Sequence, residues 1–176
     1  ADGGSSISYH LVSGYDRIYY LFCGCKQKNV EKTVRKSKER LMEQVTIGGL
    51  TAKRGEKVNG FISVEGTRIQ LPVTLICGTT DGETVLISGG VHNAEYVGIQ
   101  SAIQLSHDLE PDKISGQVII IHLMNPSGFE HRTMSLVYED GKNLNRVFPG
   151  AADGTPTQKL AAFLESEIIG HTDYLV

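Results

Sequence analysis

The chain has 176 residues, of which 40% are hydrophobic and 21% charged, with 17 basic and 20 acidic side chains. This length gives room for one domain with a sizeable core, and the formal net charge of −3 offers no positive field for nucleic acid or for an acidic membrane surface. No apolar run reaches the roughly 18–20 residues of a membrane-spanning helix. We therefore expect a globular protein that binds neither nucleic acid nor membrane.

The cysteines favour a reducing compartment. Cys23, Cys25 and Cys77 are odd in number and contain no Cys-x-x-Cys pair, so neither a disulfide framework nor a structural zinc knuckle is expected. The main interpretation is reduced thiols in a cytoplasmic protein. A lipid-modified or exported leader is the alternative, because Cys23 and Cys25 follow the apolar run Ile18–Phe22, but a basic segment and a long apolar core are missing before them.

Residues 1–45 lack the alternating strand and helix patterns of the later residues and are interpreted as an N-terminal extension of unclear role. Within them, Lys28–Val45 is dense in charge, and its apolar residues include the i,i+4 pairs Val30/Val34 and Leu41/Val45. This spacing predicts a mainly solvated helix. A basic arm that grips a partner is the alternative, although glutamates interrupt the basic residues.

Residues 46–176 alternate between strand and helix patterns and form the second unit. Strands are expected on both sides of the Glu65-Gly66 turn and at three later positions, with helices between them. The expected elements are strands Lys57–Val64, Thr67–Cys77, Thr84–Ser88 and Gln117–Met124, helices Glu95–Leu109 and Thr157–Ile169, and the beginning of a strand at Asp173–Val176. This order predicts an α/β fold with a mostly parallel, mixed central sheet flanked by helices, with its ligand site outside the carboxyl ends of the strands.

A histidine and a carboxylate follow the strand that ends at Ser88. His92 and Glu95 are three residues apart, after the flexible pair Gly89-Gly90 and at the start of a helix. An imidazole nitrogen and a carboxylate oxygen at this spacing can meet on one cation, and zinc accepts both at about 2.0–2.2 Å. The alternative is a chance surface pairing.

Two further segments carry polar side chains. Asn125-Pro-Ser-Gly-Phe129 follows the strand Gln117–Met124, and Arg132 comes next, where it could polarise a carbonyl or simply cap a loop. Asn145 and Arg146 lie in a polar loop that ends at Pro149-Gly150. An arginine binds a carboxylate through two parallel hydrogen bonds, which predicts a substrate with a free carboxylate. The alternative is a loop stabilised by its own amides.

The three segments together resemble the succinylglutamate desuccinylase/aspartoacylase family, within the zinc-carboxypeptidase-like hydrolases. They are Gly89-Gly-Val-His92-Asn-Ala-Glu95-Tyr, Asn125-Pro-Ser-Gly-Phe129 and Asn143-Leu-Asn145-Arg146-Val-Phe-Pro-Gly150. The resemblance runs from about Thr46 to Val176, which would be the N-terminal part of a zinc-hydrolase-like catalytic domain.

The resemblance implies a zinc ion bound by His92 and Glu95. It implies that Arg132 helps to polarise the scissile carbonyl and that Asn145 and Arg146 hold the substrate carboxylate. The implied reaction is hydrolysis of the amide or ester bond of N-acyl amino acids or related small carboxylates by a zinc-bound water, and zinc lowers the pKa of such a water toward about 7.

The sequence departs from the family in two places. The third zinc ligand and the general base of the family would fall beyond Val176, so we expect a truncated catalytic domain, and Asn93 replaces a glycine that many relatives have. Two alternatives follow: a catalytically inactive binding or scaffold module that keeps the fold, or a metallocarboxypeptidase. A sheet that ends here would also expose an edge through which two copies could pair.

Overall fold

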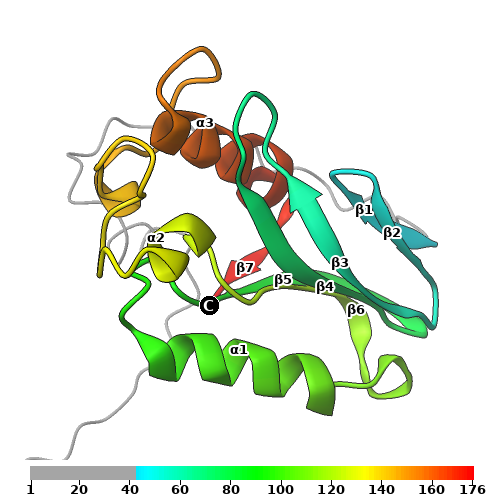
Figure 1. Ribbon diagram of the computed structural model, residues 1–176. Coiled ribbons are helices and arrows are strands. Elements are labelled where there is room, and N and C mark those ends of the chain that lie inside the picture. The colour runs from blue at the N-terminus through cyan, green and yellow to red at the C-terminus, as the bar shows by residue number, and fades with distance from the viewer. Residues whose placement is uncertain (1–42) are drawn as a thin grey trace, which may run out of the picture.

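The computed structural model describes residues 43–176 and has a five-stranded sheet at its centre (Figure 1). In spatial order the strands are β3 (Lys57–Ser63), β4 (Gln70–Cys77), β6 (Ser115–Ile121), β5 (Thr80–Ser88) and β7 (Tyr174–Leu175). β3 pairs antiparallel with β4, and β4 pairs antiparallel with β6. β5 pairs parallel with both β6 and β7. The mixed α/β sheet expected from the sequence is confirmed, and its parallel pairing is confined to the strands beside β5.

Two layers of helix cover the two faces of this sheet (Figure 1). Helix α1 (Tyr96–Asp108) connects β5 to β6 and lies on one face, and α3 (Pro156–Phe163) lies on the other. The helical path of α3 continues as one π-helical turn, η4 (Leu164–Ile168), and then as the 3-10 turn η5 (Ile169–His171). A sheet covered on both faces needs strands that are apolar on both sides, which accounts for the Val-Ile-Ile-Ile run of β6.

Alternation along the strands divides the buried side chains into two cores. Val118 and Ile120 of β6 pack with Ile76 and Ala102 on the α1 side. The larger core lies on the α3 side, and it includes Leu71, Leu75, Leu86, Ile119, Ile121, Leu160, Leu164 and Ile168. Successive strand residues point to opposite faces, so one apolar run in β6 supplies both cores and fixes its register against β4 and β5.

A separate two-stranded sheet precedes the central one. It consists of β1 (Gln44–Ile47) and β2 (Leu50–Lys53), paired antiparallel, and its buried residues Val45, Ile47 and Ala52 join the larger core. Most of the helix expected at Lys28–Val45 lies outside the described residues. At its described end the expectation is wrong, because Gln44 and Val45 are in β1, where Val45 is buried opposite Ala52.

The remaining elements are short, and the first of them precedes β6 in the chain whereas the other two follow it. They are the 3-10 turn η2 (Pro111–Lys113), helix α2 (Pro126–Glu130) and the 3-10 turn η3 (Leu144–Arg146). In Figure 1, α2 and the loop that contains η3 lie beside the end of the sheet where β5 leads into α1. Among residues 43–176, no helix has both the length and the apolar character to cross a membrane.

Candidate metal and carboxylate site

The turn that follows β5 is fixed to the end of β6 by backbone hydrogen bonds. Met124 N donates to Gly89 O at 2.9 Å, and Asn125 N donates to Gly90 O at 3.1 Å. Gly90 has φ +66°, and a Cβ there would lie 2.5 Å from the side chain of Leu123. The left-handed conformation therefore favours glycine at this position, and a larger residue would also displace the end of the Leu123 side chain. The turn places His92 and Glu95 at the end of the sheet where β5 ends.

His92 and Glu95 are in direct contact. His92 Nδ1 lies 3.0 Å from Glu95 Oε1. The His92 side chain is 26% exposed and that of Glu95 is 65% exposed, so a solute can reach the pair from one side. The two side chains that the sequence singled out are thus brought together, as their spacing predicted.

The other ring nitrogen of His92 faces Asn143. Nε2 lies 3.3 Å from Asn143 Oδ1, and the same oxygen accepts a hydrogen bond from Asn145 N at 2.9 Å. Both ring nitrogens therefore face oxygens that accept hydrogen bonds. A cation bound at Nδ1 would leave the ring proton on Nε2, where Asn143 Oδ1 can accept it. Metal-binding histidines commonly have such a partner on the ring nitrogen that does not bind the metal.

The geometry of this pair fits a divalent cation. Two ligands about 2.1 Å from one zinc ion, at the tetrahedral angle, are about 3.4 Å apart, and the observed 3.0 Å needs only a small widening. Within residues 43–176, no group of three or more histidine, cysteine, aspartate or glutamate side chains is arranged to hold a metal. The His92–Glu95 pair is therefore a candidate for two ligands of a cation, without a third such side chain beside it among the described residues.

Arg132 lies in the loop after α2, in an uncommon backbone conformation. Its φ is +56°, and Met134 two residues later has φ +63°. Such angles are costly for non-glycine residues and concentrate at functional sites. The loop reaches the His92 turn directly, because Ala94 N donates to Met134 O at 3.0 Å. Arg132 is exposed, and in the described part of the chain its guanidinium forms no ion pair.

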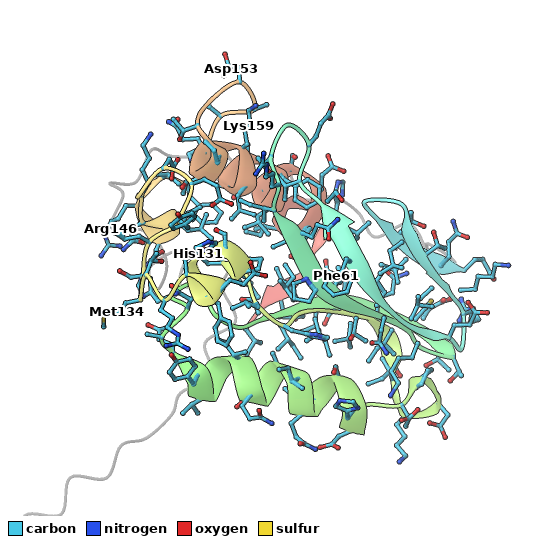
Figure 2. All side chains as sticks on the ribbon, in the orientation of Figure 1. Phe61, His131, Met134, Arg146, Asp153 and Lys159 are labelled. Atoms are coloured by element: carbon cyan, nitrogen blue, oxygen red, sulfur yellow. The ribbon has the colours of Figure 1, made fainter. Side chains whose placement is uncertain are left out.

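Asn145 and Arg146 lie on η3, directly after the Asn143 contact. Asn145 Oδ1 is the single buried side-chain polar atom without a hydrogen-bond partner among the described residues. A buried polar atom without a partner is costly, so this oxygen is suited to a ligand group that donates a hydrogen bond. Arg146 is exposed, and the hydrogen bond of its guanidinium within residues 43–176 goes to its neighbour's carbonyl, Asn145 O, at 3.3 Å. Arg146 and His131 are on the same side of the molecule (Figure 2).

The other histidines near these segments are held elsewhere. His131 Nδ1 donates to Ser127 O at 3.0 Å, and its ring stacks on Tyr138 with centroids 3.6 Å apart. His122 Nε2 lies 2.8 Å from Thr74 Oγ1 within the sheet. Burial, together with the charge of His107, lowers the pKa of His122. Neither histidine forms part of a metal cluster with the His92–Glu95 pair.

Sequence reasoning did not find the roles of Asn143 and Asn125. Asn143 is 51 residues from the imidazole that it contacts, and Asn125 is buried among backbone groups of the Arg132 loop. The signal was present, since both asparagines belong to the motifs that also contain the singled-out residues. An asparagine that directly follows a buried strand, or that precedes a short helical turn, is a candidate for such a role.

The sequence of this chain matches a protein-family model and a curated relative. The model of the succinylglutamate desuccinylase/aspartoacylase catalytic domain matches residues 81–176. A curated relative, N-alpha-acetyl-L-2,4-diaminobutyric acid deacetylase of Halomonas elongata, is 37% identical over 109 residues, which are 61% of this chain and 31% of the relative.

Several solved structures are also similar to this chain. The succinylglutamate desuccinylase/aspartoacylase of Rhodobacter sphaeroides is 31% identical with a TM-score of 0.61, and an aspartoacylase family protein of Mesorhizobium loti is 32% identical with a TM-score of 0.61. The product-bound ectoine utilization protein EutE (DoeB) of Ruegeria pomeroyi is 27% identical with a TM-score of 0.62. Each comparison covers 68% of this chain and 38% of the solved chain. The chain thus spans between about a third and two fifths of the length of these relatives.

Proposed function

Because the chain belongs to the succinylglutamate desuccinylase/aspartoacylase family, we propose that it carries the metal-binding and carboxylate-binding part of a zinc-dependent deacylase. Its substrates would be N-acyl amino acids or related small carboxylates, cleaved at the amide or ester bond. The relatives named above as a deacetylase and as a succinylglutamate desuccinylase/aspartoacylase support the deacylase class.

One observation supports this proposal most strongly. The His92 imidazole contacts a carboxylate through Nδ1 and an amide oxygen through Nε2. A histidine that merely fills a surface would not need both partners. With zinc bound at Nδ1 and Glu95 Oε1, the ring proton would lie on Nε2 and be accepted by Asn143 Oδ1, which is the arrangement of a metal-binding histidine with an outer partner.

The residues then divide the chemistry between them. Zinc, when bound by His92 and Glu95, would polarise the scissile carbonyl and lower the pKa of a bound water. Arg132, which is free of carboxylate partners in the described region, would stabilise the negative charge that develops on the carbonyl oxygen. The guanidinium of Arg146 and the Nδ2 of Asn145 would donate hydrogen bonds to the substrate carboxylate. The buried Asn145 Oδ1 would accept one from an N–H group of the substrate.

A hydrolysis assay on the protein at its natural length tests this function. We expect the zinc-loaded protein to release acetate or succinate from N-acyl amino acids, and to leave the corresponding α-carboxamides nearly uncleaved, because an amide cannot accept two charge-assisted hydrogen bonds from Arg146. Arg146→Lys should raise KM by about ten- to a hundredfold. Arg68→Lys, at an exposed arginine of the β3–β4 turn, is the matched control.

Two results would contradict the proposal. One is equal cleavage of the carboxylates and the carboxamides, which would remove the role given to Arg146. The other is full activity of His92→Ala after removal of metal by a chelator, which would remove the role given to zinc.

A further inference from the structure

A buried pair of asparagines joins the segments of the site, and the proposed reaction does not use either of them. Asn125 is 1% exposed and Asn93 is 2% exposed. Asn93 lies between the two proposed zinc ligands in sequence, and Asn125 lies between the end of β6 and α2, which it caps. Buried amides are costly unless their polar atoms are paired, so what they contact shows what they hold in place.

The amide of Asn125 has one orientation that satisfies its neighbours. Its Oδ1 accepts a hydrogen bond from Gly128 N at 3.0 Å. Its Nδ2 donates to Leu136 O at 3.0 Å and to Asn93 Oδ1 at 3.4 Å. The Gly128 N–H can only donate and the Leu136 carbonyl can only accept, so rotating the Asn125 amide by 180° would lose both of these bonds.

These three bonds connect three separate segments. Asn93 belongs to the turn that presents His92 and Glu95, Gly128 belongs to α2, and Leu136 ends the loop that carries Arg132. A second set of backbone bonds connects the same segments. Ala94 N donates to Met134 O, and Thr133 N donates to Gly128 O, both at 3.0 Å.

The approach of the loop to Asn125 depends on a glycine. A Cβ at Gly128 would lie 2.4 Å from Leu136 O and 2.5 Å from Asn125 Nδ2. The loop also contains the two positive-φ residues Arg132 and Met134. Uncommon backbone angles persist only where the surroundings hold them, and the Asn125 amide bonds to the carbonyl that ends this loop.

We propose that Asn125 is a positioning residue that sets the Arg132 loop relative to the His92–Glu95 pair. Its amide touches neither metal nor substrate, and it acts by bonding Leu136 O and Asn93 Oδ1 at the same time. The catalytic consequence rests on the proposed function, in which Arg132 stabilises charge on the carbonyl, whereas the structural consequence does not.

The test uses Asn125→Asp, which keeps the size of the side chain and the acceptor for Gly128 N. It replaces the donor Nδ2 by an oxygen, which then faces the two acceptors Leu136 O and Asn93 Oδ1. Hydrogen exchange reports on the loop without metal or substrate. In the variant, the amides of Ala94 and Thr133 should lose protection by about tenfold or more relative to amides of β6. The control is Leu164→Ala, in the buried continuation of α3, chosen because it lowers overall stability without touching the loop.

Loss of protection at Ala94 and Thr133 beyond that of the control supports the proposal. Unchanged protection, or the same loss in Leu164→Ala, overturns it. If Asn125→Asp does not fold, Asn93→Ala takes its place, because it removes one of the three bonds and leaves the cap of α2 intact. It should then cause a smaller loss at Ala94, whose N–H bonds to Met134 O across the two segments, and no loss there overturns the proposal.

The kinetic arm separates positioning from stability. In the zinc-loaded protein at natural length, Asn125→Asp should lower kcat by about tenfold or more with KM changed by less than about threefold, because Arg132 acts in the transition state. Unchanged kcat in the folded variant overturns the proposal. If wild type itself hydrolyses no N-acyl substrate, the proposed function fails, and the exchange measurement still decides the role of Asn125.

Discussion

Replacing Asn143 with alanine is expected to weaken zinc binding without unfolding the protein. Asn143 Oδ1 faces His92 Nε2 at 3.3 Å and accepts from Asn145 N at 2.9 Å. Loss of the partner of a metal-binding histidine typically lowers metal affinity by about 10- to 100-fold, which corresponds to about 1.4–2.7 kcal/mol. Loss of the hydrogen bond to Asn145 N should lower the free energy of unfolding by about 1 kcal/mol.

A competition titration against a zinc-binding indicator measures this effect. Asn143→Asp restores an acceptor opposite Nε2, so it should bind zinc at least as tightly as wild type. Asn59→Ala is the matched control, because Asn59 also accepts one side-chain hydrogen bond, from Thr74 Oγ1 at 2.6 Å, but on β3. Zinc affinity of Asn143→Ala within about twofold of wild type would refute the reasoning, since losing the partner of a metal-binding histidine should weaken binding by much more than that.

Two predictions concern pH. Asp140 is partly buried, which alone would raise its pKa, but hydrogen bonds from the Thr157 and Thr155 side chains and from nearby backbone N–H groups lower it overall. The stability that the ionised Asp140 contributes is present above its unfolded-state pKa of about 3.9 and is lost as pH falls through its lower folded-state pKa. Asp140→Asn should therefore weaken the fall of the urea-unfolding midpoint at acid pH. The same fall in the variant and in wild type would contradict this role of Asp140. Burial, and then the charge of His107, lowers the pKa of His122. Stability should therefore rise with pH between that lowered value and about 6.5, and His122→Gln should reduce this rise in thermal midpoints, whereas an equal rise in the variant would contradict the assignment.

Local patterns predicted the parts of the fold that depend on near neighbours in sequence. The Glu65-Gly66 turn marked the β3–β4 hairpin. The apolar run of β6 marked a strand covered on both faces. The spacing of His92 and Glu95 placed the two side chains in contact because three residues at the start of a helix allow it. Each of these features depends on residues that are close together in the sequence.

The features that sequence reasoning missed depend on distant partners. The antiparallel pairing of β4 with β6 joins strands that are far apart in the sequence, and no local pattern encodes its direction. The positive φ of Arg132 is maintained by a loop held at Leu136 O by Asn125. Likewise, the strand at Gln44–Val45 replaces the expected helix end because it pairs with β2, and pairing overrides the helical spacing of Leu41 and Val45.

Zinc binding by point variants tests whether His92 and Glu95 jointly hold one divalent cation. Equilibrium dialysis would compare wild type with His92→Ala, Glu95→Gln and the control His107→Ala, whose histidine is exposed in the last turn of α1. We expect wild type and His107→Ala to bind zinc equally, and His92→Ala and Glu95→Gln each to bind it at least about tenfold more weakly. Equal zinc affinity in all four proteins would contradict the account.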